Sequence, residues 1–150
     1  MAGGKRGAGK RAGGAKLSAD KKKAMADANF KRGLKLRNHM FGRAGAEDQI
    51  ESATDFNLPL QDFVSRICFG EIWQRPHLDK KTRSMITLAM LVAMSREQEI
   101  KVHVRGALAN GATKDEIREL LMHSIIYCGI PRAVGAFRAA AEVLKEMGQE

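Results

Sequence analysis

The stretch of sequence that decides the fold is residues 95–110, SREQEIKVHVRGALAN, which has the pattern of an amphipathic helix. Ser95 is a favourable N-cap with Gln98 three residues later, as in a capping box, and Gly111 follows as a natural stop. The apolar residues between these ends recur every three or four positions: Ile100, Val104, Ala107 and Leu108. The pattern predicts a helix that buries this face.

Glu99 and His103 stand four residues apart on the neighbouring stripe of that helix. Side chains at this spacing are neighbours, so the carboxylate can hold the imidazole ring and increase its basicity. Such a couple can transfer a proton. The alternative is an ordinary surface pair, which is the commoner arrangement, so the rest of the chain has to decide between the two interpretations.

The positive charge of the chain lies in its N-terminal part. The net charge is +9, but residues 1–45 hold thirteen Lys or Arg against two Asp or Glu, and the remainder holds thirteen against fifteen. Residues 1–16 are mostly Gly, Ala, Lys and Arg, so we expect a disordered basic tail ahead of a single domain, residues 17–150. A nucleic-acid-binding arm is disfavoured, because no aromatic residue is interleaved for base stacking.

The cysteines and the hydropathy of the chain indicate the cellular compartment in which the protein is expected. Cys68 and Cys128 are far apart and have no metal-ligand spacing, which argues against a zinc site or a disulfide framework. The chain has no run of about 18 apolar residues and no apolar middle region of a signal peptide at its start. We expect a cytoplasmic protein without a metal and without membrane contact.

Five further segments have helical patterns: residues 18–41, 59–72, 82–94, 113–127 and 131–147. Pro59 and Pro131 suit first helical turns, and Thr113 with Glu116 forms a capping box. Residues 82–94 are almost continuously apolar, so we expect the central buried helix there, and a polar link at 44–55. In the last helix we expect these residues to face inward: Val134, Phe137, Ala141 and Leu144. The result is an all-α protein of about six helices.

A second polar stripe lies on the predicted helix 113–127. Glu119, His123 and Tyr127 follow one another at spacings of four, so they share a face. Imidazole and phenol groups can both donate or accept a proton. An ordinary polar edge with a hydrogen-bonded His and Tyr is the alternative for each of them.

The sequence resembles the carboxymuconolactone decarboxylase family, within the alkylhydroperoxidase-like superfamily, over about residues 30–144. The matching residues are Gly70-Glu71-Ile72-Trp73, Arg75-Pro76, Leu78-Asp79, Thr82-Arg83-Ser84, Arg96-Glu97, Glu99, His103, Asn110-Gly111, Glu116-Ile117-Arg118-Glu119 and Tyr127-Cys128-Gly129-Ile130-Pro131. The resemblance implies a small helical protomer that assembles into a ring, a hexamer or a trimer.

The resemblance also implies a reaction. The expected enzyme is a carboxy-lyase that converts 4-carboxymuconolactone to 3-oxoadipate enol-lactone and carbon dioxide in aromatic-acid breakdown, the β-ketoadipate pathway. No cofactor is expected, because the lactone carbonyl itself accepts the electrons that the departing carboxylate leaves behind. The partners are then a small lactone carboxylate and further copies of the chain.

Site roles follow from the chemistry that this reaction needs. We expect His103, oriented by Glu99, to donate the proton or to hydrogen-bond the developing oxyanion, and His123 or Tyr127 to supply the other role. The planar guanidinium groups of Arg83 and Arg96 suit the substrate carboxylates, because they bind in bidentate fashion. Trp73, in the first matching motif, is assigned to substrate binding with them.

Three alternatives remain at this stage. A family member acting on another lactone or a small keto acid is the strongest, because pocket shape decides specificity. A thiol-dependent peroxidase is weaker: aligning the superfamily's C-x-x-C-x-x-x-H motif on His103 puts Arg96 and Glu99 at the cysteine positions, which leaves only the distant Cys68 and Cys128. A polyanion-binding protein without enzymatic activity is the third.

Overall fold

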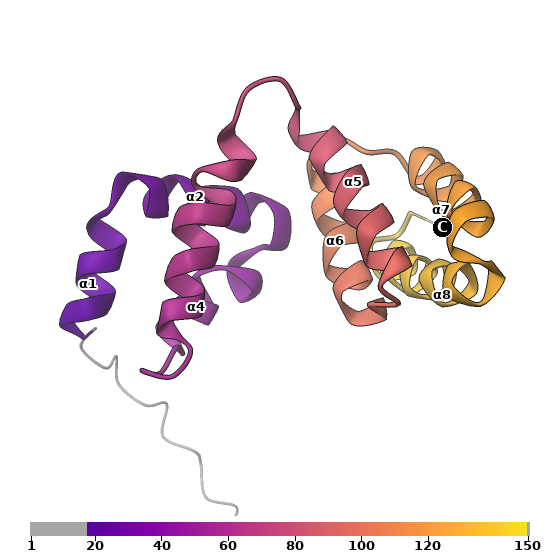
Figure 1. The fold of residues 1–150 in the computed structure, drawn as a ribbon. Coiled ribbons are helices and arrows are strands. Elements are labelled where there is room, and N and C mark those ends of the chain that lie inside the picture. The colour runs from indigo at the N-terminus through magenta and orange to yellow at the C-terminus, as the bar shows by residue number, and fades with distance from the viewer. Residues whose placement is uncertain (1–17, 150) are drawn as a thin grey trace, which may run out of the picture.

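The computed structural model describes residues 18–149, and all regular elements within that range are helical. The eight α-helices are α1 (Ala19–Ala26), α2 (Ala28–Phe41), α3 (Glu47–Glu51), α4 (Leu58–Phe63), α5 (Lys80–Ala93), α6 (Glu97–Ala109), α7 (Lys114–Cys128) and α8 (Ile130–Glu146) (Figure 1). Short helical turns are η1 (Arg43–Gly45), η2 (Val64–Phe69) and η3 (Ile72–Gln74), of which η2 has π-helical geometry. The all-α prediction is confirmed, but six helices was too low a count.

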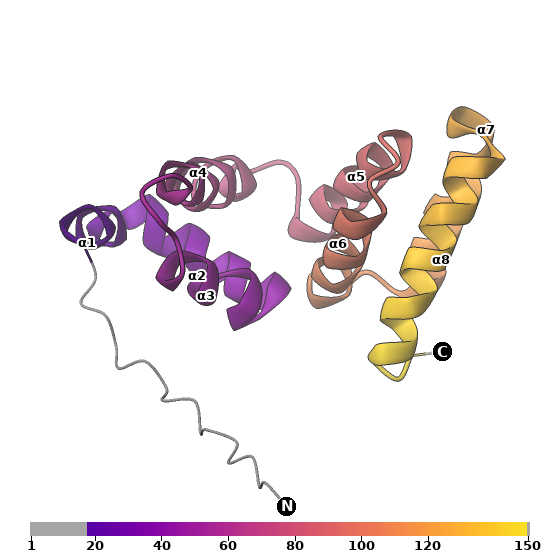
Figure 2. The same ribbon diagram turned by 90° about the horizontal axis from the view of Figure 1, so that it is seen from below.

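The helices form two groups that meet at one seam. Helices α1 to α4 lie on one side and α5 to α8 on the other, joined by residues 75–79, which arch over the top (Figures 1 and 2). Helices α2 and α6 pack together across the seam. Gly106 permits this approach, because a Cβ there would lie 2.7 Å from Cε1 of Phe41 and 2.9 Å from Cε of Met40.

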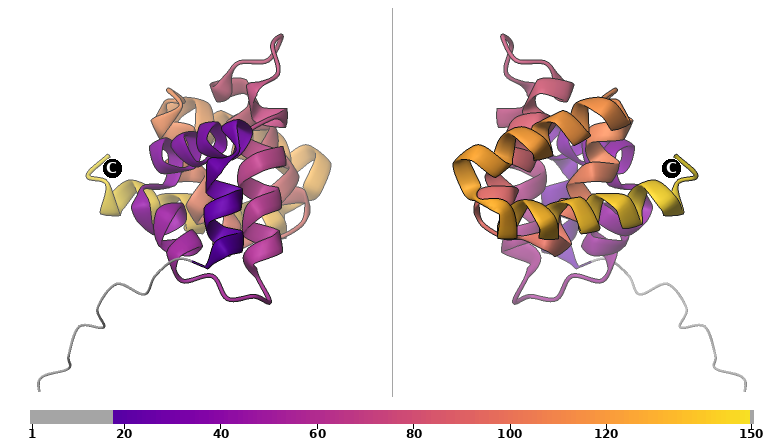
Figure 3. Two further views of the ribbon diagram at one scale, coloured as in Figure 1. Left: turned by 90° about the vertical axis from the view of Figure 1, so that its left-hand side faces the viewer. Right: turned by 90° about the vertical axis from the view of Figure 1, so that its right-hand side faces the viewer.

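Each group has its own apolar core. Helices α7 and α8 form a hairpin that covers the side of α5 and α6 away from the seam (Figure 3, right). The core of this C-terminal group is built from Leu88, Val92, Ile100, Val104, Ala107, Ala112, Ile117, Leu121, Ala136, Ala139, Ala140 and Val143. The smaller cluster of the N-terminal group consists of Leu36, Met40, Phe69 and Trp73. The seam therefore runs between two separately packed cores.

Helix α2 and η2 pack so closely that their backbones are in contact at Gly33. A Cβ on Gly33 would lie only 1.8 Å from the carbonyl oxygen of Ser65, so only glycine fits there. Beside this contact the buried guanidinium of Arg37 donates to neutral acceptors: Oγ of Ser65 at 2.7 Å, Oε1 of Gln61 at 3.0 Å and the carbonyl of Gly45 at 3.1 Å. Because its burial is compensated by these bonds, Arg37 fixes α2 to the following segments.

Several predicted helix ends were wrong. Residues 18–41 form two helices, because the Asp27 side chain accepts from the backbone N–H of Phe30 at 2.9 Å and starts a new helix. Helix α6 begins at Glu97, not at Ser95: Ser95 has a positive φ of 57°, and its hydroxyl accepts from Arg132 instead of capping. The expected polar link at 44–55 contains η1 and α3. The capping box of Thr113 and Glu116 is present as predicted.

Helices α5 and α8 differ from the prediction in the face that they bury. Met90 on α5 and Met94 at its C-cap are 59% and 65% exposed, so α5 is not a central buried helix. On α8, Val134 is 48% exposed, and the buried face is built mainly of small residues: Ala133, Gly135, Ala136, Ala139, Ala140 and Val143. The prediction favoured large side chains, whereas alanines form the contact because they let α8 approach α6 closely.

The predicted tail at residues 1–16 lies outside the described residues. Within residues 18–149, the helices are all too short or too polar to span a lipid bilayer.

Candidate active site

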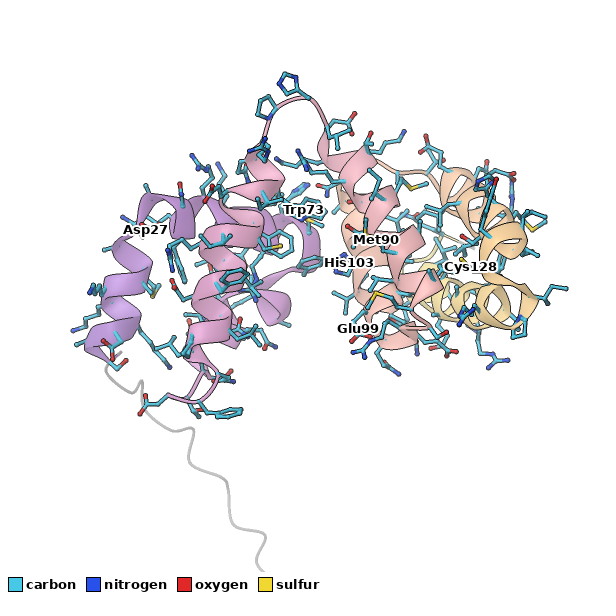
Figure 4. All side chains as sticks on the ribbon, in the orientation of Figure 1. Asp27, Trp73, Met90, Glu99, His103 and Cys128 are labelled. Carbon is cyan, nitrogen blue, oxygen red and sulfur yellow. The ribbon has the colours of Figure 1, made fainter. Side chains whose placement is uncertain are left out.

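His103 lies on α6 at the seam between the two helix groups. Its ring packs edge-on against the ring of Phe41 at the end of α2, with centroids 5.3 Å apart and an angle of 75° between the planes. Figure 4 shows His103 extending toward the N-terminal group. Its Nδ1 atom is buried and has no hydrogen-bond partner among residues 18–149. An unpaired buried imidazole nitrogen is unusual and marks this position as a candidate for ligand contact.

Burial controls the protonation of His103. Loss of hydration lowers its pKa below the ordinary value, and the negative charge of Glu99 opposes this to a smaller extent. The imidazole is therefore neutral at neutral pH, with one nitrogen that donates and one that accepts. A neutral imidazole can donate a hydrogen bond to a developing oxyanion. It becomes protonated only when a neighbouring negative charge stabilises the imidazolium.

Glu99 is engaged elsewhere. Its carboxylate accepts a hydrogen bond from Arg96, three residues earlier, and this ion pair lowers the pKa of Glu99. No hydrogen bond joins Glu99 to His103, although the two are one turn apart on α6. The side chains of Arg96 and Glu99 are both partly exposed. The structure thus places Arg96, Glu99 and His103 near one another on the sequence of α6. Arg96 and Glu99 pair with each other, and Nδ1 of His103 has no hydrogen-bond partner among residues 18–149.

A cluster of cations lies at the start of α5, beside the arching segment. Arg83 donates through Nη2 to the carbonyl of Arg75 at 2.9 Å, and its Nε is buried without a partner among the described residues. Lys80 donates to the carbonyl of Trp73 and to Oε1 of Gln74, and burial, followed by the charge of Arg83, lowers its pKa. All of these acceptors are neutral, so the charges of Lys80 and Arg83 remain uncompensated by a carboxylate within the described part of the chain.

Trp73 belongs to the N-terminal core. It is 7% exposed, and its ring packs against Phe69 with centroids 5.3 Å apart. Phe69 in turn contacts Phe41, which contacts His103. In this arrangement Trp73 supports the wall of the seam through two other rings, and its predicted contact with substrate stays a prediction.

His123 and Tyr127 lie on a different face. Their rings are 4.9 Å apart on α7, and both side chains are exposed. His123 and Glu119 border an open, shallow groove against α5, whose other lining residues are Met85, Ile86, Ala89, Leu120 and Met122. Helix α7 packs on α5 and α8, whereas His103 faces α2. Within one chain the two predicted stripes therefore do not form one site.

Phe41 and Lys80 are candidate site residues that the sequence did not indicate. Phe41 gave a weak signal, as an apolar residue just before the Gly42 stop, but its contact with His103 joins distant parts of the chain. Lys80 looked like an ordinary first-turn lysine, and only its burial beside Arg83 distinguishes it. Neither property can be read from local spacing.

Residues 18–149 also contain a further cavity and two free thiols. A cavity of about 540 Å³ between α1 and α4 is lined by Asp20, Asp27, Asp55 and Asp62, with basic and apolar neighbours. No group of three His, Cys, Asp or Glu side chains within residues 18–149 is placed to hold a metal ion. Cys68 and Cys128 are free thiols that pack against different cores, and burial raises the pKa of Cys68.

The chain is similar to a known protein family and to individual proteins of named activity. The model of the carboxymuconolactone decarboxylase family matches residues 59–142, which include all seven residues predicted for the site. The chain is 41% identical over 119 residues to a 4-carboxymuconolactone decarboxylase of Acinetobacter baylyi, covering 79% of this chain and 89% of the relative. It is 36% identical over 118 residues to a nitrosuccinic acid decarboxylase of Metarhizium robertsii, covering 79% and 82%.

Proposed function

The chain belongs to the carboxymuconolactone decarboxylase family, and from that premise we propose that it converts 4-carboxymuconolactone to 3-oxoadipate enol-lactone. The observation that carries this proposal is the similarity over 89% of a relative that bears this activity in its name. Both curated relatives named above are decarboxylases, which supports a carboxy-lyase. The pathway context, aromatic-acid breakdown in the cytoplasm, is part of the proposal.

The chemistry needs no electron acceptor beyond the substrate. The bond between the ring carbon and its carboxylate breaks, carbon dioxide leaves, and the electron pair moves through the ring alkene to the lactone carbonyl oxygen. A proton then adds to the carbon next to that carbonyl, and the enolate collapses to the product lactone. The protein has to stabilise the oxyanion, deliver one proton and bind two carboxylates.

His103 is the residue that we assign to the oxyanion and the proton. Support comes from its half-buried position and from the buried Nδ1 without a partner in the described residues. The apolar wall formed by Phe41 and Phe69 lowers the local dielectric, which strengthens a hydrogen bond to developing charge. Losing one such donor costs about 10² to 10³ in turnover.

Arg83 and Arg96 are the groups that we assign to the substrate carboxylates. Arg83 has an unused buried N–H and a neighbouring Lys80 whose charge is also uncompensated within residues 18–149, so an anion is favoured there. Arg96 is held by Glu99, so a substrate carboxylate has to compete for it. His123 and Tyr127, on the far face, then act on a substrate only if a second copy of the chain brings its α7 to the seam.

Assembly into a homo-oligomer, a hexamer or trimer, is part of the proposal. The outer faces of α5, α7 and α8 carry exposed apolar side chains that would gain from a partner: Ile86, Met90, Met94, Met122, Ile126, Ile130 and Val134. Light scattering tests this directly. The Met122→Lys, Ile126→Lys double variant is expected to dissociate, whereas Met147→Lys, at the end of α8, keeps the wild-type mass.

The similarity to the Metarhizium protein suggests nitrosuccinic acid as a second candidate substrate. Nitrosuccinic acid, named for the Metarhizium protein, resembles carboxymuconolactone in carrying two carboxylates, one of them beside an electron-withdrawing group. The nitro group can take the electron pair that the lactone takes in the first reaction. The same cationic residues and the same proton donor would serve, and the shape of the seam would decide between the substrates.

The proposal is tested by mixing the purified protein with freshly generated 4-carboxymuconolactone, without added metal or cofactor, and following ultraviolet absorbance and carbon dioxide release. We expect rapid turnover, and nitrosuccinic acid is assayed in parallel. His103→Ala is expected to lose at least a hundredfold in kcat. Folded protein that releases no carbon dioxide from either acid would contradict the proposal.

A further inference from the structure

Arg96, Glu99 and His103 form an incomplete chain of contacts on α6. Arg96 and Glu99 are paired with each other, and the Nδ1 of His103 is buried with no partner in the described residues. A carboxylate is the group that most often orients a working imidazole through its second nitrogen. The group suited to this task is present one turn away, but it is bound to an arginine.

The helix makes a second arrangement of Glu99 accessible. Residues at this spacing have Cβ atoms about 5 to 6 Å apart, and a helical side chain leans toward the N-terminus, which carries the ring of His103 over the turn that holds Glu99. Only the side-chain torsions of Glu99 have to change. From α2 the neighbour of the ring is the uncharged Phe41, so Glu99 is the charged group that acts on His103.

The present partner of Glu99 is weakly held. Both side chains of the Arg96 and Glu99 pair are substantially exposed, at 55% and 40%, and exposed pairs of this kind contribute little to stability. A substrate carboxylate can bind Arg96 through two parallel hydrogen bonds and brings a second negative charge with it. The exchange of one carboxylate for another on Arg96 therefore costs little.

We propose that substrate binding moves Glu99 from Arg96 to His103. A carboxylate of the substrate takes the place of Glu99 on Arg96, and the freed Glu99 accepts a hydrogen bond from Nδ1–H of His103. Nε2 of the imidazole then faces the substrate. The imidazole can take a proton from the hydronium or buffer acid of the solvent and pass it to the lactone carbon next to the carbonyl after carbon dioxide has left. The identity of the carboxylate rests on the proposed function, whereas the exchange itself does not.

This arrangement makes Glu99 a positioning residue whose effect depends on ligand. In the free protein His103 stays neutral because it is buried without its acceptor. In the complex the neighbouring carboxylate raises the affinity of His103 for a proton, so the acid forms only when a substrate is bound. Binding and proton delivery are thereby coupled through one side chain.

The exchange is tested by nuclear magnetic resonance of full-length protein with ¹⁵N-labelled histidine, which reports the pKa and the tautomer of His103. The probe is adipate, a six-carbon dicarboxylate that cannot decarboxylate. In the wild type, we expect saturating adipate to raise the pKa of His103 by about one pH unit or more and to select the Nδ1–H tautomer.

Variants separate the exchange from simple charge effects. Arg96→Gln frees Glu99, so the raised pKa and the Nδ1–H tautomer are expected without adipate. Glu99→Gln should show neither change with adipate, and the Arg96→Gln, Glu99→Gln double variant should resemble the free wild type. Arg105→Gln removes another α6 arginine, which is paired with Glu146, and serves as the matched control.

Either of two results would overturn the proposal. One is a His103 in Arg96→Gln that titrates like the free wild type, a measurement that needs no ligand. The other is an equal shift with adipate in Glu99→Gln, which would mean that the ligand's own charge acts on the ring. An exchange seen in a protein that decarboxylates neither acid would refute the proposed function alone.

Discussion

The ring of Phe41 meets the ring of His103 edge-on across the seam, with centroids 5.3 Å apart. Phe41 ends α2 and His103 lies in the middle of α6, so this contact joins the two helix groups at the proposed site. It explains both the burial of the imidazole and its lowered pKa. The properties of the site therefore depend on how closely α2 and α6 approach.

Phe41→Ala is expected to admit water to His103. Its pKa should rise toward the ordinary value, and kcat should fall about tenfold or more, because hydrogen bonds to developing charge weaken in a wetter site. Histidine titration by nuclear magnetic resonance and steady-state kinetics check this. Phe63→Ala, which removes an exposed ring on α4, is the control and should change neither quantity.

Stability should depend on pH through His103. Its folded pKa lies below the unfolded value near 6.5, so the unfolded chain binds a proton first as the pH falls. The free energy of unfolding should drop below about pH 6.5, by at most about 1.4 kcal/mol per pH unit from this group. Urea denaturation between pH 5 and 7.5 measures the slope. His103→Gln should flatten this slope.

Gly33 and Gly106 offer a matched comparison of two helix contacts. In Gly33→Ala the new Cβ would lie 1.8 Å from a backbone carbonyl that cannot move aside, so a loss of about 3 kcal/mol or more is expected. In Gly106→Ala the nearest atoms are the ends of the Phe41 and Met40 side chains. Their adjustment and the gain of about 1 kcal/mol in helix propensity should leave stability nearly unchanged. Equal losses in chemical denaturation would contradict this account.

Arg83→Lys should weaken substrate binding while preserving the charge. The lysine has no planar fork for a carboxylate, so KM is expected to rise about tenfold to a hundredfold with a smaller change in kcat. Steady-state kinetics check the division between the two constants. Arg118→Lys, on the exposed start of α7, is the control. A fall in kcat at constant KM would place Arg83 in the chemical step instead.

Local signals in the sequence predicted most of the longer helices and showed that Glu99 and His103 lie one turn apart on the same helix. Capping and periodicity act within a few residues, which is why the start of α7 at Thr113 was predicted correctly. They could not show that Asp27 divides residues 18–41 into two helices, because the apolar pattern continues through it. Ser95 failed as a cap because its backbone turns to a positive φ, where its hydroxyl reaches Arg132.

The seam could not be predicted in the same way. The partner of His103 is Phe41, the partner of Glu99 is Arg96, and Lys80 is partly buried near Arg83. The contact between His103 and Phe41 depends on packing between distant segments, whereas the other two pairs each lie within one short stretch of chain. Glu99 can pair with Arg96, three residues before it, or with His103, four residues after it. Spacing permits both pairs and cannot rank them.

Helix α6 packs against helices from both the N-terminal and the C-terminal part of the chain. It packs against α2, which is made early, and against α8, whose Val143 completes the core around Val104. A growing chain on the ribosome therefore lacks part of the packing that stabilises the helix carrying Glu99 and His103 until its last helix has emerged. The site should be among the last features to form during synthesis, and chains that end before α8 should lack it, however much of the N-terminal group has folded.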